Sequence, residues 1–450
     1  MDMDIPRLIL AEEATGSLPV GVMLAGALKQ RGYKLRLFSS YRDERVLRLV
    51  ELVCSQRCHH LDAEALGTVS RLKALFEAAS AEGELSLVLS PLGHRGKNDR
   101  FFPADSTLKL MEALECPVLP ILRADTSAFA AAGVLAQVMG AIPPNWAPMG
   151  LFLGVPNPRE YQLLDREVGR RLPFLSLGYL PRDFIRDMPS VEELCSSKSP
   201  ALLAGLKAAV ARLQSMEHQV LWPAFGALGT MAEPWRPQDM PELLPSKPMV
   251  GILKHHSMSL GGGNGEALLA AMGCSVVPVP VEDGDLPQGL DGLLIPHGPA
   301  YLGLLELRNN RSLVASIGRM FLSGKPVLAD GGSAVILGRE VLAPSGSVRG
   351  LAMFPYDGIA PGSDGELEPR VIRAVEDGPL LKKGETSLGL KSPWSGFLRS
   401  RETQGEWQVE YVKGGLEGMD GWSLRKGVAC SVRLELWSCY SRVRRWLGGL

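Results

Sequence analysis

The stretch LILAEEATGSLPVGVMLAGALKQRGYKLRLFSS, residues 8–40, decides the fold. It contains an apolar run, a short polar loop, a helical pattern that ends near Gly32, and a second apolar run. This order predicts a strand, a helix and a second strand of one parallel sheet, because parallel neighbours need a crossover connection. The loop at residues 14–19 then lies at a helix N-terminus, where backbone amides could hold an anion.

The same alternation of apolar runs and helical patterns continues along the chain. It recurs at LSLVLS, PVLPILR, GLFLGV and PFLSLGYL, which predicts a parallel sheet covered by helices over residues 1–233. Residues 234–247 are rich in proline. Because proline fixes φ and lacks a backbone N–H donor, we expect a stiff extended linker there. A second α/β pattern, from MVGILK to KPVLAD, predicts a second domain over residues 248–450 with a mixed sheet.

The composition of the 450 residues is that of an ordinary globular protein. The formal net charge is -1, so no bulk field draws the chain to nucleic acid or to a membrane. The long apolar stretch at residues 129–155 is broken by Pro143 and Pro144, which disfavours a membrane-spanning helix. Acidic Asp2 and Asp4 do not suit a signal peptide, and seven scattered cysteines suggest reduced thiols. We therefore expect a cytoplasmic protein.

Five further segments, taken in order, resemble one known family. They are CHHLDAEALG (58–67), LGYLPRD (177–183), LPQGLDGLLIPHGPAYL (286–302), GKPVLADGGSAVILGRE (324–340) and KGVACSVRLELWSCYSRVRRWL (426–447). Together with residues 8–40 they are similar to the cobyrinate a,c-diamide synthases. The resemblance implies a dethiobiotin-synthetase-like P-loop domain, which uses MgATP to activate corrin carboxylates. It also implies a flavodoxin-like class I glutamine amidotransferase domain, in which a cysteine hydrolyses glutamine.

The nucleotide loop departs from the family pattern. A P-loop needs a lysine for the phosphate charge and a hydroxyl for Mg²⁺, but Ser17 and Leu18 stand at those positions. Leu89 stands where the family has an acidic residue, and Asp125, near the next strand end, reads as a solvated loop acid. Gly16 and Ser17 would bind the nucleotide if any binding is retained, and MgATP is a cofactor only in that case.

The glutaminase residues are also replaced. The resemblance places the nucleophile at Gly331, which has no side chain to attack with, and the family's histidine strand at Arg433 and Glu435. His297 stands where glycine is usual near the oxyanion turn, and Ser333 reads as a helix cap rather than a substitute nucleophile. The sequence therefore predicts no catalytic residues at this site and no glutaminase activity.

Two groups of residues could bind a metal by type alone. The segment CSQRCHH, residues 54–60, contains thiols and imidazoles, but its spacing matches no usual zinc motif and it reads as a structural or substrate-facing loop. His255 and His256 follow a predicted strand, at a rim where active sites occur. Adjacent residues on a strand point to opposite faces, so we expect no joint ligation and no metal site.

Two features near the C-terminus remain. Cys430 and Cys439 read as a buried small residue and a surface thiol rather than as a pair. The terminal RVRRWLGGL, residues 442–450, is a basic amphipathic tip that could meet an acidic partner, although a solvated helix face is the simpler interpretation.

These observations leave three functions open. The first is a pseudoenzyme of cobalamin or tetrapyrrole metabolism that binds an anionic tetrapyrrole, an active homologue or a second copy of itself. The second is an ATP-dependent carbon–nitrogen ligase that amidates a tetrapyrrole with free ammonia. The third is unrelated chemistry on the same scaffold, because a fold does not fix a function.

Overall fold

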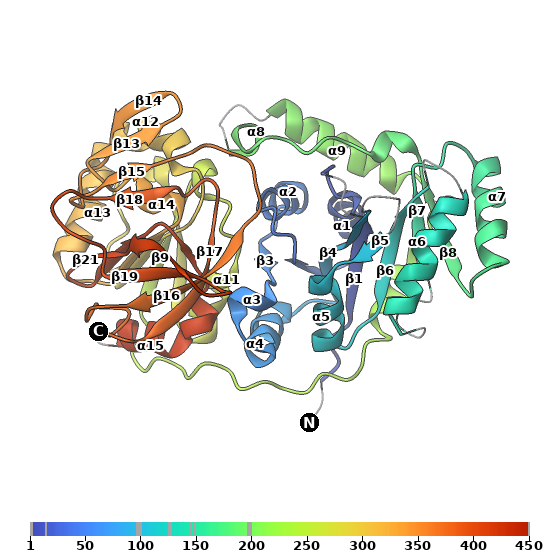
Figure 1. The fold of residues 1–450 in the computed structure, drawn as a ribbon, viewed down its shortest axis with the longest axis horizontal. Coiled ribbons are helices and arrows are strands. Elements are labelled where there is room, and N and C mark those ends of the chain that lie inside the picture. Colours follow the sequence, from blue (N-terminus) through green and yellow to red (C-terminus); the bar gives the residue numbers. More distant parts are fainter. Residues whose placement is uncertain are drawn as a thin grey trace.

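Two α/β domains lie side by side in the computed structural model (Figure 1). The structure describes residues 3–13, 16–95, 101–124, 128–143, 146, 149–195 and 200–448. A long extended segment around residues 234–248 carries no helix or strand and runs along one edge of the molecule from the first domain to the second. Among the described residues, no helix combines the length and the apolarity that crossing a membrane requires.

The sheet of the first domain has the order β3-β2-β4-β1-β6-β7-β8, and all of these neighbours pair in parallel. A short strand, β5, pairs antiparallel with the end of β4. The predicted parallel sheet is confirmed. The strands are β1 (Arg7–Glu13), β2 (Leu35–Ser39), β3 (Cys58–His60), β4 (Leu85–Arg95), β5 (Phe101–Pro103), β6 (Val118–Arg123), β7 (Met149–Leu153) and β8 (Leu175–Leu180).

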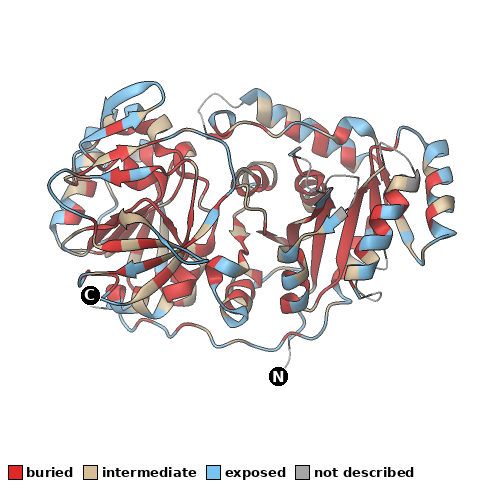
Figure 2. Cartoon of the chain, in the orientation of Figure 1, coloured by how far each residue is buried: buried red, intermediate tan, exposed pale blue. Residues whose placement is uncertain are grey.

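Helices cover both faces of this sheet, because side chains along each strand alternate between two apolar cores. Ile9 and Ala11 of β1 belong to one core, and Leu8 and Leu10 to the other. Figure 2 shows the resulting buried strands between helices with exposed outer faces. The helices are α1 (Val20–Gln30), α2 (Arg45–Cys54), α3 (Ala63–Leu66), α4 (Val69–Ser80), α5 (Asp105–Leu114), α6 (Ala128–Ala141), α7 (Pro158–Gly169), α8 (Val191–Cys195), α9 (Pro200–Gln214) and α10 (Pro223–Gly229).

The central sheet of the second domain has the order β10-β9-β11-β12-β22-β21. Only β21 runs antiparallel to its neighbour, so the predicted mixed sheet is confirmed. The strands are β9 (Met249–Lys254), β10 (Ser275–Pro280), β11 (Gly292–Ile295), β12 (Val327–Asp330), β21 (Trp422–Leu424) and β22 (Gly427–Cys430), and the helices are α11 (Asn264–Ala271), α12 (Leu304–Asn309), α13 (Arg311–Leu322), α14 (Gly332–Val335) and α15 (Tyr440–Gly448).

Two smaller sheets that the sequence did not predict complete this domain. Their orders are β14-β13-β15-β18 and β20-β19-β16-β17-β23. Their strands are short and lie in Gly-rich sequence, which weakens the alternation on which a prediction depends. They are β13 (Glu340–Ala343), β14 (Gly346–Arg349), β15 (Asp357–Ile359), β16 (Glu368–Ala374), β17 (Thr386–Lys391), β18 (Phe397–Arg399), β19 (Trp407–Tyr411), β20 (Leu416–Asp420) and β23 (Arg433–Leu434).

The apolar core continues from one domain into the other. Leu72 and Phe76 of α4 belong to the same cluster of buried side chains as Leu268 of α11 and Trp437 of the second domain. A core shared in this way holds the two domains together by burial of apolar surface. The loop at Gly16 and Ser17 and the turn at Gly331 both lie near this boundary.

Candidate functional site

The loop after β1 is closed by the chain itself. Residues 14 and 15 lie outside the described part, but Gly16 has a φ of +73°, and Ser17 forms an isolated bridge with Asp187. The amide of Leu18 donates to the carbonyl of Arg186 at 2.9 Å. The side chain of Leu18 is buried in the core, so the position of the family's Mg²⁺-binding hydroxyl faces apolar neighbours.

A carboxyl group of the same domain occupies the N-terminus of α1. Oε2 of Glu12 accepts hydrogen bonds from the amides of Val20, at 2.6 Å, and Gly21, at 3.4 Å. Burial raises the pKa of Glu12 to about 8, against the opposing effect of these two amide donors. The expectation that the helix amides are available for an anion is therefore wrong for these two, because Glu12 already takes them.

The surroundings of this loop do not fit MgATP. Gly16 and Ser17 line a cavity of about 90 Å³, and its other polar lining residues include Glu12, Asp43 and Glu366, with no lysine or arginine in the described lining. Phosphate oxygens placed there would meet carboxylates rather than cations. Leu89 is buried in the same apolar core as α1, so it offers nothing to a metal.

The turn after β12 retains the backbone of a nucleophile elbow without the nucleophile. Gly331 joins β12 to α14 with φ +58° and ψ −137°, a conformation that glycine adopts without strain. A Cβ atom built on Gly331 would overlap Nδ1 of His297. The imidazole of His297 therefore occupies the space that a nucleophilic side chain would need.

His297 connects the elbow to the first domain. The amide of Gly332 donates to Nδ1 of His297 at 3.1 Å, and Nε2 of His297 lies 2.7 Å from Oε2 of Glu44, at the start of α2. The hydroxyl of Ser392 donates to the other oxygen of Glu44 at 2.7 Å. Burial alone would raise the pKa of Glu44, but His297 and Ser392 hold it below its usual value. The imidazole and the carboxyl group are both buried.

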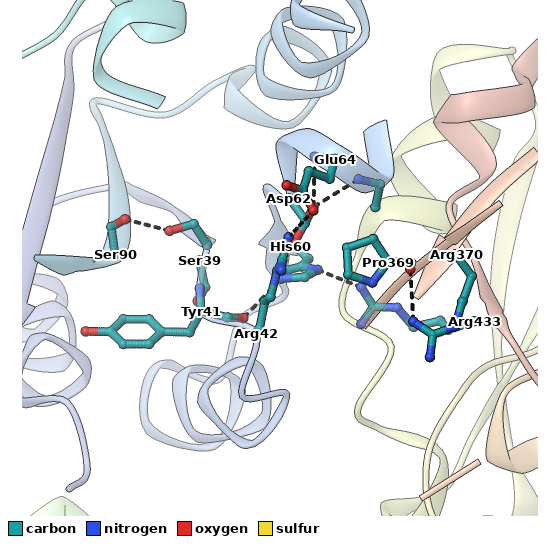
Figure 3. A network of polar contacts seen from close by, with 12 residues as sticks. Ser39, Tyr41, Arg42, His60, Asp62, Glu64, Ser90, Pro369, Arg370 and Arg433 are labelled. Atoms are coloured by element: carbon teal, nitrogen blue, oxygen red, sulfur yellow. Dashed lines mark hydrogen bonds and ion pairs between the residues drawn. The ribbon is translucent and has the colours of Figure 1, made fainter. Parts of the chain in front are cut away.

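The strand that carries histidines in the family instead carries contacts between the domains (Figure 3). Arg433 donates to Nδ1 of His60 at 2.7 Å, and Nε2 of His60 donates to the carbonyl of Tyr41 at 3.0 Å. Burial, followed by the nearby Arg433, lowers the pKa of His60 to about 3. A neutral imidazole thus joins the two domains as an acceptor and a donor at once.

Asn264 makes a second contact between the domains. Its side chain accepts from the amide of His60 at 2.9 Å and donates to the carbonyl of His60 at 2.8 Å. It also donates to Oε2 of Glu435 at 2.8 Å. Burial raises the pKa of Glu435 to about 7, in part against the effect of Arg433 and Asn264. Arg433 and Glu435, which stand at the positions of the family's histidines, thus each form a hydrogen bond with another side chain.

The space left at this former site is small. A cavity of about 60 Å³ lies among Asn264, His297, Asp330, Arg433 and Glu435. A water occupies roughly 30 Å³ in the liquid, whereas ligand pockets usually measure roughly 300–1,000 Å³. The cavity therefore has room for waters rather than for an amino acid substrate.

Comparison with known proteins identifies the relatives of the chain. The cobyrinate a,c-diamide synthase of Dehalococcoides mccartyi strain 195 is 21% identical over 355 residues, 75% of this chain and 74% of that protein. The hydrogenobyrinate a,c-diamide synthase of Streptomyces coelicolor is 26% identical over 397 residues, 75% of this chain and 77% of that protein. The chain is thus similar in sequence to cobyrinate and hydrogenobyrinate a,c-diamide synthases over about three quarters of its length. No family model matches it.

Solved structures resemble the domains individually. A glutamine amidotransferase is 16% identical, covers 45% of this chain and 99% of its own, and gives a TM-score of 0.33. The MinD cell division protein of Aquifex aeolicus is 13% identical, covers 48% of this chain and 99% of its own, and gives a TM-score of 0.27. Both TM-scores lie below 0.5, so these likenesses add no argument about function.

Two other residues of the amidotransferase-like domain, Ser333 and Cys439, differ from expectation. Ser333 is not a helix cap: Gly331 precedes α14, and the hydroxyl of Ser333 donates to the carbonyl of Pro296 at 2.5 Å. Cys430 is buried as predicted, but Cys439 is buried too and is not a surface thiol. Its burial follows from the packing of the 3-10 turn Leu436–Cys439 against β17.

The segment CSQRCHH contributes to the core. Cys54 and Cys58 are buried, and burial raises the pKa of both thiols. The ring of His59 packs 5.5 Å from that of Phe38, its Nδ1 has no hydrogen-bond partner, and burial lowers its pKa to about 4. Within the described part of the chain, these side chains do not form a cluster of three metal ligands.

The remaining predicted residues are placed as follows. Asp125 lies outside the described residues. Arg442 and Arg445 pair with Glu385, and Arg444 pairs with Glu242, so the basic tip makes ion pairs within the chain. His255 and His256 do not point to opposite faces: their ring centroids lie 3.8 Å apart. The alternation ends because β9 stops at Lys254 and a 3-10 turn begins at His256.

Proposed function

We propose that the chain is a noncatalytic relative of the cobyrinate a,c-diamide synthases that acts in corrinoid or tetrapyrrole metabolism by binding an active homologue. The observation that carries the proposal is the imidazole of His297 in the place of the nucleophile at Gly331, bonded to Glu44 of the other domain. A lost cysteine alone would leave a gap. Here the gap is filled by a contact that holds the two domains together.

The first domain supports the same proposal independently. Glu12 bonds the amides at the start of α1, and the cavity beside Gly16 and Ser17 is lined with further carboxyl groups. Without bound MgATP a carboxylate of the substrate is not activated, so a free-ammonia ligase also lacks its driving reaction. According to this proposal, the chain forms no amide from either glutamine or free ammonia.

The charge of a cleft near these loops disfavours an anionic tetrapyrrole as its ligand. A cavity of about 360 Å³ lies beyond the ends of β2 and β3. Its lining includes five acidic side chains and two basic ones, and like charges in contact oppose binding. The acidic residues are Asp43, Asp62, Glu64, Asp105 and Glu366, and the basic ones are Arg42 and Lys109.

We also propose a cytoplasmic location. All seven cysteines are buried and unpaired, a state that a reducing compartment maintains. An active homologue from the same cell is then available as a partner, and a second copy of this chain is the competing one.

The proposed function is tested by calorimetry and by chromatography. MgATP and a cobyrinate-type tetrapyrrole are titrated separately into the purified chain, with a catalytically active cobyrinate a,c-diamide synthase as positive control. We expect no heat of binding from MgATP and no glutamine hydrolysis. We also expect the chain to co-elute with the active homologue on size-exclusion chromatography.

Each contrary outcome identifies another function. Micromolar MgATP binding together with amide formation from ammonium would overturn the proposal in favour of a ligase. Tetrapyrrole binding without co-elution would show that the chain binds a small ligand and not an active homologue. If the chain alone elutes at twice its own mass, its partner is a second copy of the same chain.

A further inference from the structure

A cluster of potential metal ligands lies outside both former sites. It consists of His255 and His256 after β9 and Glu306 on α12, and their ligand atoms all lie within 4.8 Å of one another. Nε2 of His255 lies 3.0 Å from Oε2 of Glu306, and Nε2 of His256 lies 3.7 Å from the same oxygen. Among the described residues, this is the one cluster in which three such side chains meet.

These distances suit a tetrahedral metal ion. Ligands about 2.0–2.1 Å from Zn²⁺ at tetrahedral angles are themselves roughly 3.3 Å apart, and 3.0 and 3.7 Å bracket this separation. Two imidazoles and one carboxylate are a donor set that binds divalent transition metals. The fold brings them together at the carboxyl end of a parallel strand, the edge at which open α/β sheets bind ligands.

His255 is held in place by its neighbours. Its Nδ1 accepts from the amide of Ser257 at 3.4 Å and lies 2.8 Å from the hydroxyl of the same residue, so with a metal on Nε2 the ring would take the other tautomer and donate its N–H to that hydroxyl. Such a second hydrogen bond is usual for a metal-bound histidine and fixes its tautomer. A Cβ atom on Gly303 would overlap the His255 ring and the Ser257 hydroxyl, so only a glycine there lets the backbone approach so closely.

The other two ligands leave a route for the ion. The side chain of His255 is 2% exposed, whereas those of His256 and Glu306 are 19% and 51% exposed. His256 and Glu306 therefore face solvent, from which an ion can reach the buried His255.

We propose that His255, His256 and Glu306 form a binding site for one divalent transition-metal ion of the Zn²⁺ class. Three protein ligands leave a fourth position for water or another exchangeable donor. The site adjoins the boundary between the domains, since the amide of Leu260, shortly after the histidines, donates to the carbonyl of His297 at 3.2 Å. A bound ion would therefore stabilise the loop next to the His297–Glu44 contact.

The test is titration of the full chain, freed of any affinity tag, with Zn²⁺ in competition with a fluorescent chelator. We expect one equivalent to bind, and at least a tenfold loss of affinity in both His256→Ala and Glu306→Gln. His218→Ala, which removes an exposed histidine elsewhere, is the matched control and should bind as the unaltered chain does. Both test residues are partly exposed, so the variants should fold.

A second readout identifies the ligands. Co²⁺ bound by two imidazoles and a carboxylate in a tetrahedral arrangement gives intense visible absorption, which should disappear in His256→Ala and persist in His218→Ala. The proposal is overturned if the unaltered chain binds no stoichiometric Zn²⁺. It is equally overturned if the two test variants bind Zn²⁺ as tightly as the control variant.

Discussion

The loop after β1 and the turn at Gly331 both depart from the pattern that the resemblance implies, and their surroundings differ. At the loop, Glu12 bonds the amides of a helix within its own domain. At the elbow, His297 fills the vacant space and reaches Glu44 of the other domain. The first replacement is local and closes a binding site. The second is a contact between the two domains, so we expect its residues to contribute to the stability of the whole chain.

Restoring a cysteine at the elbow should have the largest effect. In Gly331→Cys the new side chain overlaps the His297 ring and adopts a φ of +58°, so we expect a loss of about 4 kcal/mol in the free energy of unfolding. Urea denaturation measures it. His297→Ala/Gly331→Cys should lose less than the sum of the two single losses, because the overlap is gone and only the backbone strain at position 331 remains. Strictly additive losses would contradict this account of the elbow.

At the loop, stability should depend on pH through Glu12. Its folded pKa of about 8 lies above the unfolded value near 4.5, so the folded chain holds an extra proton between these values. Stability from this residue is full below pH 4.5 and is lost as the pH rises towards 8. Glu12→Gln has no such loss, and its stability relative to the unaltered chain should grow by on the order of 3 kcal/mol from pH 5 to 8.

The pH experiment needs a control with an exposed carboxyl group. Glu64→Gln, which changes a partly exposed partner of Arg42, is measured over the same range for comparison. A flat difference for Glu12→Gln would show that Glu12 is ionised in the folded chain throughout. The charged carboxylate of Glu12 would then interact with the amides of α1 as a bound anion would.

Removing the partner of His297 should also weaken the boundary. Glu44→Ala leaves a buried imidazole and the Ser392 hydroxyl without their acceptor, and we expect a loss of about 3 kcal/mol in the free energy of unfolding. Because both domains share the contact, thermal unfolding should become less cooperative. An unchanged single transition at the original temperature would place the stabilising contacts elsewhere.

The smallest of these effects is expected at Asn264. Asn264→Ala removes two bonds to the His60 backbone and one to Glu435, with an expected loss of about 2 kcal/mol. Calorimetric melting measures it. Asn309→Ala, at the end of α12, is the matched control and should stay within about 0.5 kcal/mol of the unaltered chain.

Much of this fold could be predicted from the sequence, because buried parallel strands form apolar runs of recognisable length. The losses at Gly331, Arg433 and Glu435 could also be predicted from their place in the family's segments. What replaced them could not: Glu44 and His297 lie far apart along the chain and meet only when the domains pack. Glu12 left no such local signal either, because it lies in β1 and reaches the amides of α1 only across the intervening loop.

The pair His255 and His256 shows the opposite kind of error. Alternation of side chains holds only while a strand continues, and the strand ends one residue before the pair. A prediction from periodicity therefore fails at strand ends, where functional residues gather.

The overlap between Gly331 and His297 bears on the history of the chain. A mutation that returned cysteine to position 331 would find the histidine in its way, and one that removed the histidine first would leave Glu44 buried without its partner. Either order passes through a damaged intermediate. No single substitution therefore yields a chain that has both a side chain at position 331 and an undisturbed contact between the domains.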